Sequence, residues 1–205
     1  MAGLLQHKKV TDDEELHMTI KAVVGLGNPG NQFIKTRHNI GFRVLDALAK
    51  KYEGDWHLRG EIEFVDILID GQKIILLKPQ TFMNASGRAL SFLTKQGIKP
   101  DEILVVHDEL ELPFGKVTER LGGSARGHNG LRSIISTVGE GFHRVRCGVG
   151  RPPEHESVSD FVLKIFSEDA TLVQSLIDKA VEQVEAVCVK KNNESVLVGC
   201  PAQSI

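Results

Sequence analysis

The chain is poor in the features that mark disulfide-bonded, membrane-spanning or secreted proteins. It has an odd number of cysteines, and Cys147, Cys188 and Cys200 lack the spacing of a metal site. Its longest apolar runs, 74–77 and 103–106, are of strand length and fall far short of the ~20 residues that a membrane helix needs. The beginning of the chain has no signal-peptide pattern. We therefore expect a cytoplasmic protein without membrane contact.

Motifs for covalent ester hydrolysis and for dinucleotide binding are absent or incomplete. No serine stands in a GxSxG elbow and no cysteine adjoins a histidine motif, so no covalent intermediate is expected. The stretch Gly25–Gly30 matches GxGxxG, but Pro29 offers no amide hydrogen to a pyrophosphate. Asp46, the acid that would bind a ribose, lies in a predicted helix rather than after a strand. No second histidine lies at ligand spacing from His107. We expect neither an organic cofactor nor a metal.

Hydrophobic periodicity predicts alternating strands and helices in one domain. The chain has 205 residues, 41% of them hydrophobic, which is enough for one ordinary core. Asp70-Gly71 separates two strand patterns and favours the left-handed turn of a hairpin, which makes the sheet mixed. The expected strands are 19–26, 61–70, 72–77, 103–107, 116–120 and 145–149, and the expected helices are 41–51, 85–96, 130–138 and 168–189. We predict a single α/β domain whose central mixed, twisted sheet is flanked by helices on both faces.

This domain is predicted to span residues 19–191. Residues 1–18 are polar and show no helical or strand period, so we expect a mobile N-terminal extension. If the natural chain starts at Met18, the residues before it are non-native. The helical period is lost after Lys191, which predicts a loose tail over 192–205. No extended apolar interface pattern is visible, so we expect a monomer.

Charge is distributed unevenly along the chain. The net charge is −2, but residues 115–151 contain seven Lys/Arg against two acids, a local charge of +5. Such a surface can bind phosphate although the whole protein is mildly acidic. A solvated arginine face would give the same composition, so charge alone leaves both interpretations open.

One histidine stands in a polar loop suited to catalysis. The string Thr-Arg-His-Asn-Ile-Gly over 36–41 places His38 between a strand with its turn and the start of a helix. Histidine is the side chain best able to take a proton from water near neutral pH, and a carboxylate on its other ring nitrogen would fix its tautomer. Asp108 follows the buried strand 103–107, at the end where α/β sheets gather their active sites. Glu109 and Glu111 compete for this role on sequence alone.

Three asparagines lie in glycine-rich turns. Asn28 stands in GLGNPG, Asn84 in KPQTFMNASG and Asn129 in GHNG. An amide donates and accepts hydrogen bonds without changing charge, which suits peptide carbonyls, a terminal ribose and a positioned water. Any one of them alone would be interpreted as a turn or cap residue.

These four strings, in their order along the chain, resemble the motifs of the bacterial-type peptidyl-tRNA hydrolase family. The resemblance runs from about Thr19 to about Val187. The resemblance implies an enzyme that hydrolyses the ester between peptide and tRNA with water activated by His38, partnered by Asp108. It implies peptidyl-tRNA as the partner, with no cofactor and no obligate partner protein. Asn28 and Asn84 would be catalytic, with Asn84 at the developing oxyanion.

The resemblance also assigns the binding residues. Those implied for substrate binding are Phe33, Met83, His128 and Asn129, with Met83 as a packing wall. Those implied for tRNA phosphate binding are Arg120, Arg146, Arg126, Arg132, Lys95 and Lys99.

Two positions depart from the family pattern. Phe33 replaces a tyrosine common among relatives, which removes a hydroxyl but keeps an aromatic surface. Arg126 stands in the glycine loop where bacterial relatives often have glycine, and it would add a phosphate contact or narrow the peptide channel. The alternative function is RNA binding without hydrolysis, by a protein that kept the fold and the basic face. The presence of His38, Asp108 and all three asparagines favours the enzyme.

Overall fold

The computed structural model describes residues 19–196, and side-chain surroundings as far as Val189. One seven-stranded sheet has the order β2-β3-β4-β1-β5-β7-β6. Its strands are β1 (Ala22–Gly25), β2 (His57–Arg59), β3 (Ile62–Ile69), β4 (Gln72–Pro79), β5 (Ile103–Glu109), β6 (Val117–Leu121) and β7 (His143–Gly148). Strand β1 pairs in parallel with β4 and β5, and β5 with β7, whereas the outer pairs β2–β3, β3–β4 and β6–β7 are antiparallel. The sheet is mixed, as predicted.

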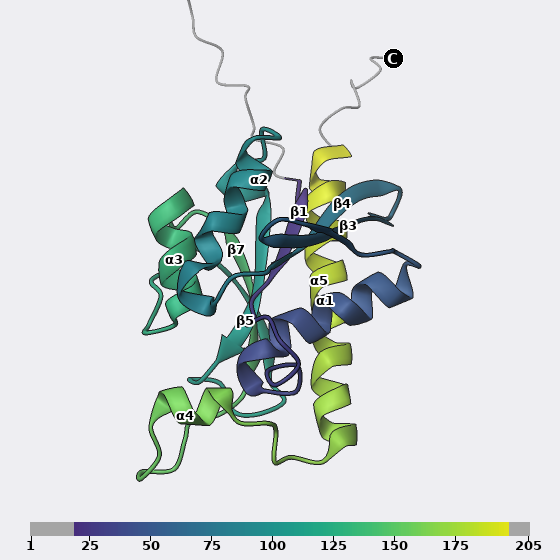
Figure 1. Cartoon of the computed structure of the whole chain (residues 1–205). Helices are drawn as coiled ribbons and strands as arrows, with labels where there is room; N and C mark the ends of the chain where they lie inside the picture. Colours follow the sequence, from purple (N-terminus) through teal and green to yellow (C-terminus); the bar gives the residue numbers. More distant parts are fainter. Residues whose placement is uncertain (1–18, 197–205) are drawn as a thin grey trace, which may run out of the picture.

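Helices cover both faces of this sheet (Figure 1). They are η1 (Arg37–Asn39), α1 (Ile40–Lys51), η2 (Met83–Leu90), α2 (Ser91–Thr94), η3 (Pro100–Glu102), α3 (Asn129–Val138), α4 (Val158–Leu163) and α5 (Ala170–Val196). Helices α1 and α5 enclose one core, which includes Leu45, Leu76 and Leu176. η2, α2 and α3 enclose a second core on the other face, around Leu90 and Ile134. The predicted α/β architecture is confirmed.

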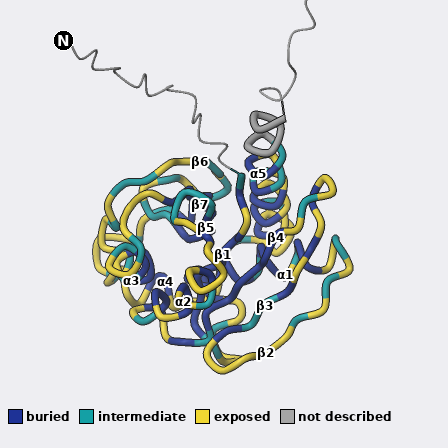
Figure 2. Tube along the Cα trace, turned by 90° about the horizontal axis from the view of Figure 1, so that it is seen from above, coloured by how far each residue is buried: buried dark blue, intermediate teal, exposed yellow. Residues whose placement is uncertain are grey.

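The central strand β1 is apolar along its whole length because both of its faces are covered. All four residues of β1 are buried, and Figure 2 shows the buried trace running through β1, β5 and the inner side of α5. In β3, nearer the sheet edge, Val65, Ile67 and Ile69 are buried while the residues between them are exposed. The predicted hairpin turn is present, since Asp70 and Gly71 have left-handed φ values of 51° and 75°.

Gly41, in the first turn of α1, lets this helix approach the sheet backbone. A Cβ atom on Gly41 would stand 2.6 Å from the carbonyl oxygen of Leu26, and closer still to the Leu26 amide nitrogen and the carbonyl oxygen of Val106. Only glycine fits such a contact. Because η1 directly precedes this turn, the same approach holds His38 against the ends of β1 and β5.

Several elements differ from the sequence expectations. Residues 83–90 form the 3₁₀-helix η2 and only Ser91–Thr94 are α-helical, so the single helix expected over 85–96 is wrong. The Ser86 hydroxyl donates to the carbonyl oxygen of Met83 (2.8 Å) and the Ser91 hydroxyl to that of Arg88 (2.9 Å). Such local bonds compete with regular α-helical geometry. The short elements β2 and α4 were not expected.

The C-terminal helix is longer than its sequence period suggests. α5 continues past Lys191 to Val196, so residues 192–196 are helical rather than part of a loose tail. The rest of that expected tail, 197–205, and the expected extension 1–18 lie outside the described residues. Within the described part of the chain, no helix is both long and apolar enough to cross a membrane.

Candidate active site

The motifs meet where the adjacent parallel strands β1 and β5 end. The turn after β1 carries Asn28, the end of β5 carries Asp108, and η1 beside them carries His38. Together they line a cleft of about 610 Å³. Other parts of its wall come from the start of η2, the start of α3 and the helix α4, with the residues Phe82, Met83, Asn84, His128, Asn129, Val158, Ser159, Val162 and Leu163.

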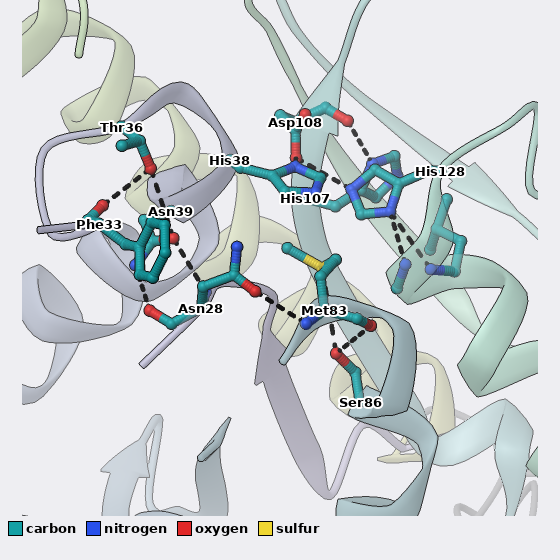
Figure 3. A network of polar contacts seen from close by, with 12 residues as sticks. Asn28, Phe33, Thr36, His38, Asn39, Met83, Ser86, His107, Asp108 and His128 are labelled. Carbon is teal, nitrogen blue, oxygen red and sulfur yellow. Dashed lines mark hydrogen bonds and ion pairs between the residues drawn. The ribbon is translucent and has the colours of Figure 1, made fainter. Parts of the chain in front are cut away.

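At the centre of the cleft, one carboxylate oxygen lies between two imidazole rings (Figure 3). Oδ1 of Asp108 is 2.9 Å from Nδ1 of His38 and 2.9 Å from Nε2 of His128. Asp108 is almost fully buried, and His38 and His128 are nearly so. The predicted pairing of His38 with Asp108 is present, and Asp108 also binds a second histidine.

Hydrogen bonds determine which ring nitrogen of each histidine carries a proton. Nδ1 of His128 accepts from the backbone amides of Gly130 (3.1 Å) and Leu131 (3.3 Å), so its proton is on Nε2, which donates to Asp108. Nδ1 of His38 donates to the same carboxylate oxygen, which leaves the lone pair on Nε2. His38 thus has an unprotonated nitrogen available on the cleft side.

The same contacts shift the ionisation of the group. Burial opposes the protonation of His38, but the charge and hydrogen bond of Asp108 outweigh it and hold the pKa of His38 above its ordinary value. Burial would raise the pKa of Asp108, yet the two histidines hold it well below its ordinary value. Asp108 therefore remains ionised, and His38 is a stronger base than an isolated histidine would be at this depth.

A third histidine, His107, supports Asp108 from behind. Its Nδ1 donates to the backbone carbonyl oxygen of Asp108 at 2.7 Å, and its ring meets that of His128 edge-on with centroids 5.2 Å apart. Burial, together with the positive charge that His128 can carry, lowers the pKa of His107 to about 3. His107 is therefore a neutral structural group.

Asn28 is held so that one donor remains free for a substrate. Its side-chain oxygen accepts from the Met83 amide at 2.8 Å, which turns the amide NH₂ group to the other side. Asn39 fixes the backbone of Asn28 from both sides, because its Oδ1 accepts from the Asn28 amide (2.9 Å) and its Nδ2 donates to the Asn28 carbonyl (2.8 Å). Asn39 stands in the same motif as His38, and this supporting contact could not be predicted from the sequence alone.

The remaining predicted substrate residues divide into two groups. Asn84, Met83, Asn129 and His128 all line the cleft. Phe33 is not among the lining residues; it is half-buried, and its carbonyl oxygen accepts from the Thr36 hydroxyl at 2.8 Å. The ring nitrogens of His128 bind Asp108 and the start of α3.

The competing carboxylates have partners of their own. Glu109 forms an ion pair with Arg146 at 3.5 Å, and Glu111 pairs with Arg151. Of the three acids that compete on sequence, Asp108 is the one that contacts His38.

One side of the cleft is basic. Arg120, Arg126, Arg144 and Arg146 line it. Arg144 is buried and donates to the carbonyl oxygens of Gly123 and Ser124, so it fixes the glycine loop; no such role was predicted from the sequence. The guanidinium of Arg120 crosses the same loop, since a Cβ on Gly123 would lie 2.9 Å from its carbon atom. Arg126 has a left-handed φ of 45°, a conformation that usually favours glycine.

The other predicted phosphate-binding residues do not line this cleft. Lys99 caps η3, which leads into the start of β5, whereas Asp108 lies at its other end. At ~3.3 Å per residue, the two ends of this seven-residue strand are roughly 20 Å apart. Lys95 follows α2, which lies at the opposite end of the molecule from α4 in Figure 1. Arg132 donates to Oδ1 of Asn129 (3.2 Å) on the exposed side of α3.

The two histidines and Asp108 also offer three possible metal ligands within 4.8 Å of one another. The donor set suits a metal poorly. A metal on Nε2 of His128 would displace its proton while Nδ1 continues to accept two amide hydrogen bonds, which requires an imidazolate. Metal-bound histidine ordinarily donates through its second nitrogen instead.

Known proteins resemble this chain in both sequence and fold. The model of the family described as "Peptidyl-tRNA hydrolase" matches residues 22–198. The chain belongs to the peptidyl-tRNA hydrolase family. This confirms the predicted family and the predicted hydrolase class. Among curated relatives, peptidyl-tRNA hydrolase from Rubrobacter xylanophilus is 47% identical over 80% of this chain and 91% of its own, and that from Fervidobacterium nodosum is 43% identical over 80% and 87%.

Solved peptidyl-tRNA hydrolases have the same fold. The structure from Acinetobacter baumannii matches with a TM-score of 0.78 and 36% identity, covering 88% of this chain and 92% of that one. A purine nucleoside phosphorylase from Toxoplasma gondii matches with a TM-score of 0.55 but 10% identity, which shows a shared fold alone.

Proposed function

We propose that this member of the peptidyl-tRNA hydrolase family releases tRNA from peptidyl-tRNA by attack of a water molecule that His38 activates. The observation that carries the proposal is the contact between Nδ1 of His38 and the ionised Asp108 at the bottom of the cleft. It leaves Nε2 as a proton acceptor in a site large enough for a polar substrate.

The reaction would proceed without a covalent enzyme intermediate. Nε2 of His38 takes a proton from water while the water oxygen attacks the ester carbonyl carbon, and the carbonyl π electrons move to its oxygen. Asp108 stabilises the imidazolium that forms. The tetrahedral intermediate then collapses, the bond to the ribose oxygen breaks, and that oxygen takes the proton back from His38. The products are a peptide with a free carboxylic acid, which then ionises to the carboxylate and releases a proton to solvent, and a tRNA with a free ribose hydroxyl.

Two amide groups are suited to the developing negative charge. The NH₂ group of Asn28 is oriented before substrate binds, because its oxygen is held by Met83. Asn84 is exposed on the cleft wall one residue further along. Donors that need no reorganisation stabilise an oxyanion most effectively, which favours Asn28 as one of the donors, and Asn84 can supply the other from the exposed cleft wall. We assign the oxyanion to Asn84, with Asn28 as a second donor, and the peptide or a positioned water to Asn129.

The basic side of the cleft would bind the phosphate backbone of the tRNA. Arg120 and Arg146 are fixed by the glycine loop and by Glu109, and Arg126 extends the same side. Phosphate contacts give affinity without reading bases, as an enzyme acting on many tRNAs requires. Lys95 and Lys99 would belong to a separate surface.

We further propose a monomer that acts in a reducing, cytoplasmic compartment. The thiols of Cys147 and Cys188 are free and buried in the core, which suits an environment that does not form disulfides.

Replacement of His38 by alanine tests the mechanism. We expect the release of label from an N-blocked aminoacyl-tRNA to slow by about 10²- to 10⁴-fold, because the general base is lost. Binding of the uncleaved substrate should persist, since the arginines are unchanged. The matched control is His57→Ala, which removes an exposed histidine of β2 outside the cleft lining.

Hydrolysis at the wild-type rate by His38→Ala would overturn the mechanism. If the wild-type protein binds the substrate tightly but releases no label, the chain is an RNA-binding protein rather than an enzyme.

A further inference from the structure

Arg37 precedes His38 directly, but its side chain points away from the cleft. Arg37 is buried, with 3% of its surface exposed, and it is absent from the cleft lining. Its guanidinium donates to the carbonyl oxygen of Ile165 (2.9 Å), the hydroxyl of Ser167 (2.9 Å) and the carboxylate of Glu168 (3.0 Å). The mechanism proposed above does not use this group.

The backbone of the same loop follows the same partner segment. The Arg37 amide donates to the carbonyl oxygen of Lys164 at 3.1 Å, and Thr36 forms an isolated antiparallel bridge with Ile165. The Arg37 guanidinium also lies 4.2 Å from the centre of the Phe161 ring and 5.3 Å from that of Phe166. The loop carrying His38 is therefore joined to residues 161–168, which are distant in sequence.

This partner segment contains part of the substrate cleft. Residues 161–163 end helix α4, and Val162 and Leu163 line the cleft with Val158 and Ser159. Apolar packing of α4 involves Phe161, Val162 and Val149. Such packing has little directional preference, whereas a planar guanidinium with three acceptors fixes both distance and angle.

We propose that Arg37 is a positioning residue that sets the α4 wall of the cleft at a fixed place relative to His38. The inference rests on the proposed function, because it assumes that His38 is the base. Arg37 touches neither the substrate nor the reacting atoms; it acts through η1 on one side and through residues 161–168 on the other. Its partner in this role is Glu168.

The test compares Arg37→Met with Arg43→Met. Arg43, from α1, lies over the same Phe166 ring at 5.7 Å but makes none of the three hydrogen bonds of Arg37. Since a displacement of about 1 Å can cost ~10²-fold in rate, we expect kcat/KM of folded Arg37→Met to fall by about 10- to 100-fold. Arg43→Met should remain within about twofold of wild type. Arg37→Lys, which keeps the charge but not the planar set of donors, should lie between them.

Two further readouts separate positioning from a general loss of structure. The acid limb of the pH–rate profile should keep its midpoint in Arg37→Met, because the contact of His38 with Asp108 is intact. Amide hydrogen exchange over residues 158–168 should become faster, while exchange in β1 and β5 should not change. If Arg37→Met does not fold, Glu168→Gln replaces it, with a smaller loss of kcat/KM expected because the amide still accepts a hydrogen bond.

Wild-type kcat/KM in folded Arg37→Met would overturn the proposal. So would an equal loss in Arg43→Met, or a loss that matches the unfolded fraction measured by circular dichroism. These results are distinct from failure of the proposed function, which appears as wild-type hydrolysis by His38→Ala.

Discussion

Replacing Asp108 by asparagine should reveal how far the base depends on its carboxylate. Asparagine has nearly the same shape, so an oxygen can still accept from Nδ1 of His38 and Nε2 of His128, but the negative charge is lost. In the wild type, this charge overcomes burial and raises the pKa of His38. Without it burial remains, so the pKa of His38 should fall below its ordinary value of 6.5.

The loss of rate can be bounded from the contact. A hydrogen bond to a charged group contributes about 1.5–3 kcal/mol. Since ~1.4 kcal/mol corresponds to tenfold in rate, loss of this contribution to the imidazolium in the transition state slows the reaction by about 10- to 100-fold. Asparagine can also present its NH₂ group and impose the wrong tautomer, an effect that reaches ~10⁴-fold where a base depends on its carboxylate. We therefore expect kcat/KM of Asp108→Asn to fall by at least about 10-fold and by no more than about 10⁴-fold.

The assay is the pH dependence of kcat/KM for an N-blocked aminoacyl-tRNA. The rate should rise as His38 loses its proton. Because the pKa of His38 is raised in the wild type, its acid limb should lie above pH 6.5, and in Asp108→Asn the limb should lie below this value on a lower plateau. Glu109→Gln is the control, since Glu109 contacts Arg146 and its loss should not move the acid limb. An unchanged limb and plateau in Asp108→Asn would refute the assigned role of Asp108.

Two further variants test the fold and the phosphate contact. Gly41→Ala places a Cβ against backbone atoms of Leu26 and Val106, and overpacking of this kind should reduce the free energy of unfolding by about 1–3 kcal/mol or more, seen as a drop of several degrees in Tm. Arg146→Gln should weaken tRNA binding and reduce the slope of log affinity against log salt by about 0.7–0.9, whereas Lys99→Gln should change neither. Equal salt slopes in the two variants would mean that Arg146 contacts solvent rather than a tRNA phosphate.

Elements set by local chemistry were predictable from sequence. Asp70 and Gly71 specify a left-handed turn by themselves, and the hairpin followed. The helix over 85–96 was not predictable in type, because the hydroxyls of Ser86 and Ser91 alter the hydrogen bonding of a pattern that has helical periodicity. Helix α4 is too short for a period to be recognised, and it is fixed by contacts with distant residues such as Val149.

The site was predictable where motifs stand at strand ends. Asn28 and Asp108 follow this rule, because the adjacent parallel strands β1 and β5 bring their carboxyl ends together. Lys99 precedes β5 and Asp108 lies at its other end, so the length of the strand separates this predicted phosphate-binding residue from the cleft. The bond between Asp108 and His128 and the support of Asn28 by Asn39 depend on tertiary geometry, for which the motifs give the residues but not their partners.

The His128 ring couples the first turn of α3 to the ionised Asp108 carboxylate. Its Nδ1 caps the helix by accepting from the amides of Gly130 and Leu131, and its Nε2 donates to Asp108. Fraying of this helix end would release the ring, and with it one of the two donors that keep the carboxylate charged. Local opening of a single helical turn is far less costly than global unfolding. A fluctuation that leaves the sheet and nearly all of the secondary structure intact would therefore remove one of the two histidine contacts of the Asp108 carboxylate.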